Sequence, residues 1–526
     1  MQPILFQSTR ISPGGRSAPV GIETAIVRGM GPDGGLYVPT RLPALPSRAL
    51  DPAPLPYSDL AYMVLAPFFP GWEDGSLRAI LEKAYGQDSA MPYFDNPEIA
   101  PLTPICLAGP SEGSARLHLL ELFHGRTCAF KDMALSVLGG FLRESLDRLG
   151  RKEPVLVLTA TSGDTGSAAL EGLSSVEGIH TAVFYPKQGT SEIQRLQMTT
   201  VGAEGRFVAG IEGNFDDAQT AVKAIFEKAG RGEGRLAGLR LSSANSINIG
   251  RLLPQIVYYV AAWRALALEG VLGEGGLMHV AVPTGNFGDI LAAKYAKEMG
   301  LPIGRLVCAS NANKVLADFF ATGVYDKRRV LMKTESPSMD ILVSSNLERL
   351  LFMASGGKPE RVSELMSELA ARGWFRIDEA EKAYISDFSS GWCSDSSAKS
   401  AISEVWKSCS ILIDPHTATA IEVALRVSEK LQPPAPIVVA ATASPYKFPR
   451  ACLEALNSGA GGCKWKDALA GDLDLAGRLS AMTGIPLPAS IRDLASKPVV
   501  HDRVLPVDGV EDALGDYASA NLGGKS

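Results

Sequence analysis

Lys131 ends the segment ELFHGRTCAFKD, residues 121–132, and its position favours reactive chemistry. The three residues before it, Cys-Ala-Phe, are apolar and favour burial of its aliphatic stem. An ammonium that loses hydration has a lowered pKa, and its neutral amine is a nucleophile toward carbonyl carbons. Such a lysine suits a covalent link to an aldehyde cofactor. An isolated Phe-Lys-Asp is more often a surface lysine at a helix start, so this interpretation depends on the other motifs.

A Gly-rich loop, Thr-Gly-Asn-Phe-Gly, spans residues 284–288 between an apolar run and a predicted helix. Its glycines let backbone N–H groups approach an anion, and the helix start adds partial positive charge. A phosphate is the ligand that this loop fits best. The alternative is a tight strand-to-helix turn that binds nothing.

Two further loops carry groups that suit an anion. The loop TATSGDTG, residues 159–166, presents hydroxyls and backbone donors that suit a carboxylate or phosphate, although Asp164 fits a helix cap equally well. The segment LSSANSINIGR, residues 241–251, offers neutral donors and one arginine, which fit an anion better than a metal. Its alternative is a polar turn with an exposed arginine. The candidate residues are Thr161, Ser162, Gly163, Asp164 and Thr165 in the first loop, and Asn245, Ser246 and Arg251 in the second.

Thr442 and His416 are weaker candidates. Thr442 ends an apolar run within ATASPYKF, where its hydroxyl suits a ring nitrogen or, equally, a backbone carbonyl. His416, in DPHTA, is interpreted as a structural histidine at a helix start. The 6 histidines have no metal-ligand spacing, so no metal site is predicted.

Three apolar runs place these loops in a fold. Residues 155–158, 280–283 and 437–440 each lead through a Gly/Ser/Thr loop into a predicted helix. This alternation predicts a mostly parallel sheet flanked by helices. Loops at the carboxyl ends of such strands build ligand sites.

The 526 residues are too many for one ordinary core. Residues 1–98 are expected to form a partly helical N-terminal cap. Residues 99–485 are expected to form the catalytic region, with a helical insertion at about 324–405. Residues 486–526 are expected to be a weakly patterned C-terminal tail.

Composition excludes several classes of partner. The net charge is −6 and no long basic run occurs, so neither nucleic acid nor a membrane surface is expected. No run approaches the length of a membrane helix, and the N-terminus lacks the apolar core of a signal peptide. The 7 cysteines are scattered and never spaced Cys-x-x-Cys, which predicts a reducing, cytoplasmic location.

Together the motifs resemble the threonine synthases, in particular the longer enterobacterial and fungal branch. The resemblance runs from about residue 18 to about residue 460. Seven segments carry it in the family's order: ELFHGRTCAFKDMALSVLG, TATSGDTGSAA, YPKQGTSEIQRLQM, SSANSINIGRLLPQIVYY, VPTGNFGDILAAKYAKEMGLP, DPHTATA and ATASPYKFP.

The resemblance implies a pyridoxal-5′-phosphate (PLP) enzyme of the tryptophan-synthase-like fold type II, an α/β fold with two open parallel-type sheets flanked by helices. It implies conversion of O-phospho-L-homoserine and water to L-threonine and phosphate, by a monomer or homodimer. Lys131 would bind the cofactor aldehyde and act as general base. Gly285, Asn286, Phe287 and Gly288 would hold the cofactor phosphate, and Thr442 would meet the pyridine nitrogen. Residues 161–165 would hold the substrate carboxylate, and Asn245, Ser246 and Arg251 its phosphate.

The chain departs from the family pattern at three positions. Arg126 replaces the proline of Phe-His-Gly-Pro-Thr, and Ser444 and Tyr446 replace the histidine and alanine of Thr-Ala-His-Pro-Ala-Lys-Phe. These changes leave open a threonine-synthase-like phospho-lyase that releases 2-oxobutyrate, or a non-catalytic relative. A dehydrogenase is disfavoured because GNFGD lacks the Gly-x-Gly-x-x-Gly spacing.

Overall fold

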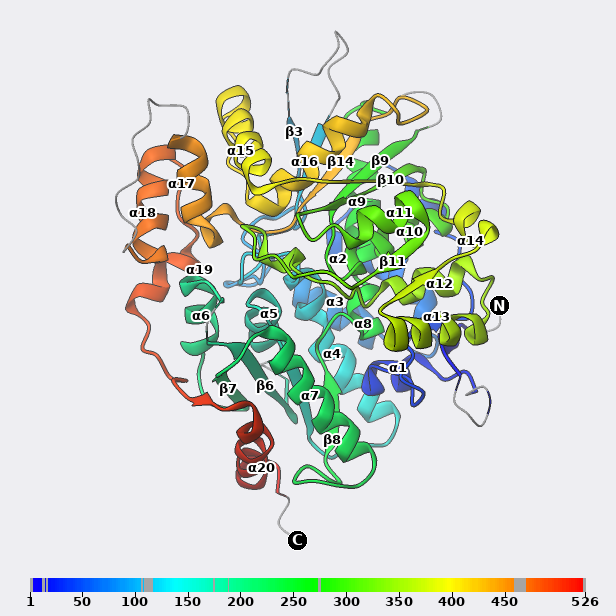
Figure 1. Cartoon of the computed structure of the whole chain (residues 1–526), viewed down its shortest axis with the longest axis vertical. Helices are drawn as coiled ribbons and strands as arrows, with labels where there is room; N and C mark the ends of the chain where they lie inside the picture. Colours follow the sequence, from blue (N-terminus) through cyan, green and yellow to red (C-terminus); the bar gives the residue numbers. More distant parts are fainter. Residues whose placement is uncertain are drawn as a thin grey trace.

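Two large β-sheets form the centre of the molecule, and helices cover them (Figure 1). The computed structural model describes residues 3–11, 15, 18–105, 107, 117–173, 176–187, 189–272, 276–457 and 470–523. Within these residues no helix is long and apolar enough to cross a membrane. The predicted α/β fold with two open, parallel-type sheets is confirmed.

The five-stranded sheet is wholly parallel, in the order β15-β7-β6-β5-β8. Successive side chains of β5 enter different cores, because Val155 and Val157 join one core while Leu156 and Leu158 join another. Burial on both faces explains why this strand reads as an uninterrupted apolar run. Helices α5 and α7 pack on β5 and β6, and α6 packs on α5. The bounds are β5 (Val155–Ala160), β6 (Ile179–Pro186), β7 (Arg206–Ile211), β8 (Arg240–Ser243), β15 (Val504–Leu505), α5 (Asp164–Leu173), α6 (Glu192–Thr199) and α7 (Phe215–Gly230).

The six-stranded sheet has the order β13-β10-β9-β14-β4-β3, and β3 alone runs antiparallel to its neighbour. Helix α16 covers one face, where its side chains share a core with Val439, and α10 covers the other, where its side chains share a core with Val438. The bounds are β3 (Leu102–Ile105), β4 (Leu117–Glu121), β9 (Met278–Pro283), β10 (Ile303–Ser310), β13 (Phe388–Trp392), β14 (Ile437–Ala441), α10 (Gly288–Glu298) and α16 (Pro415–Ser428).

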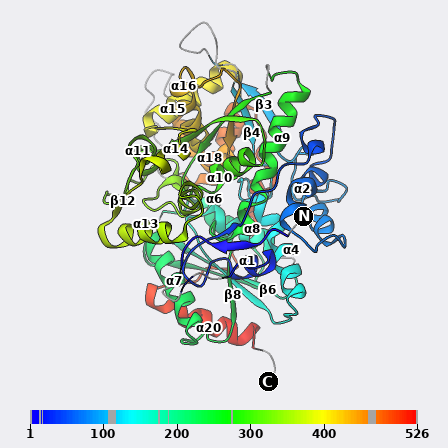
Figure 2. The same cartoon turned by 90° about the vertical axis from the view of Figure 1, so that its right-hand side faces the viewer.

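The N-terminal elements pack around helix α4 (Asp132–Arg148), which follows the candidate lysine. Helices α1 and α3 contact α4, and α2 contacts α3 and α9. Figure 2 shows α1 and α4 side by side. The partly helical character expected of this region is present, and the boundary at residue 98 stays a prediction. The bounds are β1 (Phe6–Ser8), α1 (Ile22–Arg28), β2 (Tyr37–Pro39), η1 (Ser47–Leu50), α2 (Tyr57–Leu65), η2 (Ala66–Phe68), α3 (Ser76–Tyr85), α8 (Ile249–Leu252) and α9 (Gln255–Leu268).

The region predicted as a helical insertion, about 324–405, is rich in helices but also contains strands. Strands β11 and β12 pair with each other, and β13 forms an edge of the six-stranded sheet. These strands are short, and β13 reads Phe-Ser-Ser-Gly-Trp, so they carry little apolar pattern. The remaining elements here are α11 (Val315–Thr322), β11 (Val324–Asp326), η3 (Pro337–Met339), α12 (Leu347–Ala354), α13 (Pro359–Arg372), β12 (Trp374–Arg376), α14 (Glu379–Tyr384) and α15 (Asp395–Cys409).

The described part of the C-terminal segment contains helices and one short strand, and its division as a tail after residue 485 stays a prediction. Strand β15 pairs with β7, and α20 buries Val510, Leu514 and Ala518 in the core that also contains Leu156. The spacing of these three residues is helical, but the small residues between them weaken the apolar pattern. The elements are η4 (Pro445–Lys447), α17 (Pro449–Asn457), α18 (Asp472–Thr483), α19 (Ala489–Arg492), η5 (Asp493–Ser496), η6 (Val507–Gly509) and α20 (Val510–Asn521).

Candidate active site

Lys131 lies at the N-terminal end of α4, and backbone contacts fix its position. The N–H of Phe130 donates to the carbonyl of Thr442 at 2.8 Å, and Ala129 forms an isolated bridge with Ala443. These contacts attach the lysine segment to the carboxyl end of β14. The Lys131 side chain is only 12 % exposed. The predicted burial of this lysine is therefore present.

Burial lowers the pKa of Lys131, and the nearby charges of Arg251 and Lys447 lower it further. Asp164 opposes this shift, because its Oδ2 lies 3.2 Å from the Lys131 Nζ. Cys128 has the opposite character: burial raises the pKa of its thiol to about 11, which keeps it protonated. Lys131 is the group in this segment whose environment favours a nucleophile.

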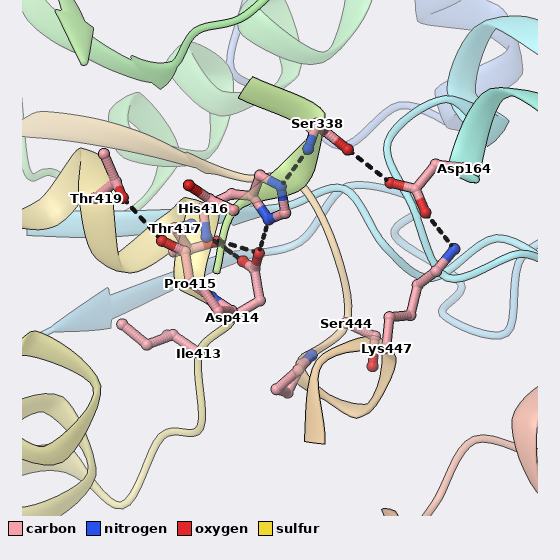
Figure 3. Close-up of polar contacts among 12 residues, drawn as sticks. Asp164, Ser338, Ile413, Asp414, Pro415, His416, Thr417, Thr419, Ser444 and Lys447 are labelled. Atoms are coloured by element: carbon pink, nitrogen blue, oxygen red, sulfur yellow. Dashed lines mark hydrogen bonds and ion pairs between the residues drawn. The ribbon is translucent and has the colours of Figure 1, made fainter. Parts of the chain in front are cut away.

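Asp164 lies between the amines of Lys131 and Lys447. Figure 3 shows its contacts with Lys447 and Ser338. Its Oδ1 lies 2.8 Å from the Nζ of Lys447 and accepts a 2.7 Å hydrogen bond from Gln194, while its Oδ2 also accepts from the Ser338 hydroxyl at 3.2 Å. Burial alone would raise the pKa of Asp164, but the charges of Lys447 and Lys131 hold it well below the ordinary value. Asp164 is thus an ionised carboxylate that orders the amine of Lys131.

The other residues of this loop divide between structural and pocket-facing positions. The Thr161 hydroxyl accepts from the backbone N–H groups of Gly163 and Gly166, at 2.9 and 3.1 Å, and so closes the loop. Thr165 lines the pocket that contains Lys131, whereas residues 161–164 are not among the residues that line it. Contact of residues 161–165 with a substrate carboxylate stays a prediction.

The Gly-rich turn follows β9 and starts α10. Phe287 has φ +65°, the left-handed conformation, and this turns the chain into the helix. A Cβ on Gly285 would lie 2.6 Å from the carbonyl oxygen of Ser338, so only glycine fits there. Asn346 holds the turn from behind by donating its side-chain amide to the Asn286 carbonyl at 3.0 Å. The turn therefore presents a rigid helix N-terminus to the pocket, as phosphate binding requires.

Arg251 supplies a second positive group on the pocket wall. Its side chain donates to the Ala244 carbonyl at 2.8 Å, while its buried Nε has no hydrogen-bond partner among the residues that the structure describes. Burial lowers the pKa of Arg251 to about 10. An anion in the pocket would relieve this desolvated charge. Of its predicted companions, Ser246 lines the pocket, whereas Asn245 does not and donates to the Ala160 carbonyl at 3.3 Å.

One pocket brings most of the predicted residues together. The predicted residues that line it are Lys131, Thr165, Ser246, Arg251, Gly285, Asn286, Phe287, Gly288 and Thr442. Sequence reasoning missed Gln255, Asp289, Ser338 and Met339, which also line it, and undervalued His416, which does so too. No motif marked the segment around Ser338, because it reaches the pocket from the helix-rich region. Lys447 belongs to the motif ATASPYKF, but nothing in the local sequence marks it as a site residue.

The three departures from the family pattern lie outside this pocket's lining. The Arg126 guanidinium lies over the Tyr93 ring at 5.0 Å. The Ser444 hydroxyl accepts from the backbone N–H of Tyr446 at 3.4 Å, and the Tyr446 hydroxyl donates to the Ile485 carbonyl at 2.6 Å. All three side chains therefore make structural contacts away from the pocket.

Comparison with known proteins agrees with this arrangement. Three family models match the chain: pyridoxal-phosphate dependent enzymes over residues 101–443, the threonine synthase N terminus over 5–85, and the threonine synthase C-terminal model over 417–507. A threonine synthase from Pseudomonas aeruginosa is 40% identical over 452 residues, which cover 84% of this chain and 89% of that protein.

Solved structures show the same similarity along the whole chain. A PLP-bound threonine synthase from Brucella melitensis has 34% sequence identity and a TM-score of 0.80, and the match covers 99% of both chains. The threonine synthase from yeast has 31% identity and a TM-score of 0.83, covering 98% of this chain and 99% of that one.

Proposed function

Because this chain belongs to the threonine synthase family of PLP-dependent enzymes, we propose that it converts O-phospho-L-homoserine and water to L-threonine and phosphate. The observation that carries the proposal is one pocket with three properties. It contains a buried lysine of lowered pKa, a Gly-rich helix N-terminus, and a buried arginine whose Nε has no partner within the described part of the chain.

The residues present fit PLP. The aldehyde needs an amine that is neutral at working pH, and Lys131 has the lowered pKa that this requires. The phosphate needs backbone donors without side-chain obstruction, and the turn from Gly285 to Gly288 offers them at the start of α10. Thr442, at the end of β14, offers a neutral hydroxyl for the ring nitrogen. When bound, PLP supplies an electron sink for the substrate's bonding electrons.

The side chains of the chain supply the proton transfers and the orientation. Lys131 Nζ takes and returns the protons of the substrate, and Asp164 holds that amine through its Oδ2 at 3.2 Å. Arg251 and Ser246 bind the substrate phosphate before it leaves, and Asn245, which donates to the Ala160 carbonyl, holds the same loop in place. The loop of residues 161–165 holds the substrate carboxylate, with Thr165 as its pocket-facing member.

Product identification tests this assignment. The purified protein, incubated with O-phospho-L-homoserine, should release phosphate and L-threonine in equal amounts. Lys131→Ala should abolish turnover, whereas Lys152→Ala, which changes an exposed lysine, should leave it unchanged. Borohydride treatment followed by peptide mapping should place the cofactor on Lys131.

The same assay separates the alternatives. Release of phosphate with 2-oxobutyrate instead of threonine would assign the chain to the phospho-lyases. A protein that takes up no cofactor and releases no phosphate would be a non-catalytic relative. The positions of Arg126, Ser444 and Tyr446 outside the pocket lining favour threonine as the product.

We further propose a cytoplasmic location and a monomer or homodimer. In the described part of the chain, Cys128, Cys308, Cys393 and Cys452 are free thiols, as a reducing compartment favours; Cys106 and Cys463 lie outside the described residues. We also propose that the chain divides at residues 98 and 485 into an N-terminal cap, a catalytic region and a C-terminal tail.

A further inference from the structure

Ser338 connects three parts of the pocket that come from distant regions of the sequence. Its backbone N–H donates to the Nε2 of His416 at 3.3 Å, and its hydroxyl donates to the Oδ2 of Asp164 at 3.2 Å. Its carbonyl oxygen occupies the space where a Cβ of Gly285 would lie, 2.6 Å away. A shift of Ser338 would therefore disturb two features at once: the Asp164 carboxylate, which holds Lys131, and the Gly-rich turn at Gly285.

His416 is held so that only one of its nitrogens can meet Ser338. The Nδ1 of His416 lies 2.6 Å from the Oδ2 of Asp414, and Asp414 is fully buried. The imidazole also packs against the Phe448 ring, with 4.9 Å between the ring centroids. Because a backbone N–H can only donate, Nε2 must accept, so Nδ1 carries the proton that Asp414 receives. Figure 3 shows this chain of contacts from Asp414 through His416 and Ser338 to Asp164.

We propose that His416, oriented by Asp414, is a positioning residue that places the Ser338 hydroxyl on the Asp164 carboxylate and thereby limits how strongly this carboxylate holds the proton of Lys131. The inference rests on the proposed role of Lys131 as the cofactor lysine. His416 acts through Ser338 and does not itself touch the amine.

The electrostatic reason lies in the two donors that share one oxygen. The Oδ2 of Asp164 accepts from Ser338 and from Lys131, both at 3.2 Å. A hydroxyl donor to a carboxylate stabilises its negative charge and reduces its pull on the neighbouring ammonium. The charged groups that face Lys131 are Asp164, Arg251, Lys447 and Asp289. Loss of the Ser338 donor would leave Asp164 a stronger partner for Lys131 and would raise the pKa of the amine.

The rate at which cofactor-free protein captures PLP, measured against pH, tests the inference. Capture needs the neutral amine, so the midpoint of the rate profile reports the proton affinity of Lys131. Ser338→Ala and His416→Leu should each move this midpoint upward by about 0.5 to 1 pH unit, as loss of one charge-assisted hydrogen bond predicts. The double variant should show the shift of Ser338→Ala alone, because both changes remove the same contact.

Two further variants separate positioning from general loosening of the structure. His416→Gln keeps an acceptor for the Ser338 N–H and should keep the wild-type midpoint to within about 0.3 pH unit. Thr419→Val changes a buried side chain of the same helix, whose hydroxyl donates to the Pro415 carbonyl at 2.9 Å, and should leave the midpoint unchanged. If His416→Leu does not fold, the inference is still tested, because Ser338→Ala should raise the midpoint and His416→Gln should not.

The inference is overturned if Ser338→Ala or His416→Leu keeps the wild-type midpoint, or if the double variant shows the sum of both shifts. A wild-type protein that captures no PLP would instead overturn the proposed function.

Discussion

Asp164→Asn replaces the carboxylate between two buried ammonium groups with a neutral amide. Lys447 is fully buried, and its Nζ would keep the Thr127 carbonyl oxygen at 2.7 Å but lose its counter-charge. Lys131 can escape the same penalty by releasing its proton, because its pKa is already lowered. Removing one partner of a buried ion pair costs about 3–5 kcal/mol, and we expect that cost to fall on Lys447.

The size of the effect on thermal unfolding follows from the chain length. An unfolding entropy of about 2.1 cal/mol/K per residue gives roughly 1.1 kcal/mol/K for 526 residues. A loss of about 3–5 kcal/mol should therefore lower the Tm of the cofactor-free protein by roughly 3–5 °C at pH 7. Asp147→Asn is the control, because its surface pair with Arg143 should change the Tm by less than about 1 °C.

A second change and a pH series make the reasoning refutable by calorimetry. Asp164→Asn combined with Lys447→Met removes both charges and should recover most of the lost Tm. Since the folded pKa of Asp164 is depressed, its stabilisation is complete above the unfolded pKa of about 3.9 and is lost as pH falls through the folded pKa. The Tm gap between wild type and Asp164→Asn should therefore narrow below about pH 4. A single variant as stable as wild type, or a double variant no better than the single one, would refute the ion-pair argument.

Three further predictions concern the pocket wall. Arg251→Leu should raise the KM for O-phospho-L-homoserine by roughly 10- to 150-fold, because it removes a charged donor to the substrate phosphate; an unchanged KM would exclude this role. Gly285→Ala should raise the PLP dissociation constant by about 10- to 100-fold in a spectroscopic titration, because the new Cβ meets the Ser338 carbonyl, whereas Gly477→Ala, with open space around it, should have no effect. Burial raises the pKa of Asp289 to about 6, so its stabilisation is complete below about pH 3.9 and is lost as pH rises through 6. The Tm of Asp289→Asn minus that of wild type should therefore increase by roughly 2–3 °C between pH 4 and pH 7. A Tm difference that stays constant over this range would contradict the raised pKa of Asp289.

The strand-loop-helix units could be predicted because burial on both faces gives their strands a continuous apolar run. Val155, Val280 and Ile437 begin or lie within such runs, and each lies in a strand of the structure. The short strand β13 could not be found in this way, because its Ser and Gly residues carry no apolar pattern. Strand β15 has only two residues, and its pairing with β7 is a tertiary contact that no local pattern encodes.

The site could be predicted where chemistry and local sequence coincide, as at Lys131 and the Gly-rich turn. It could not be predicted where a residue acts through contacts that are distant in the sequence. Asp164 illustrates the difference, because its loop was recognised but its partnership with Lys447 spans 283 positions of the sequence and appears only in three dimensions. His416 was interpreted as structural for the same reason, since its partner Ser338 lies 78 residues away.

The order of the strands explains which residues face the proposed cofactor and which face the proposed substrate. Strands β9, β14 and β4 are neighbours in the six-stranded sheet, and the segments that follow them supply the Gly-rich turn, Thr442 and Lys131. Strands β5 and β8 are neighbours in the five-stranded sheet, and the segments that follow them supply residues 161–165 and 245–251. Because ligands bind at the carboxyl ends of parallel strands, each sheet presents one group of residues to the same pocket. The six-stranded sheet thus provides the proposed cofactor contacts and the five-stranded sheet the proposed substrate contacts. Substitutions after β9 or β14 should act mainly on PLP affinity, and those that remove pocket-lining residues after β5 or β8 mainly on KM, whereas loss of Lys131 after β4 should abolish turnover itself.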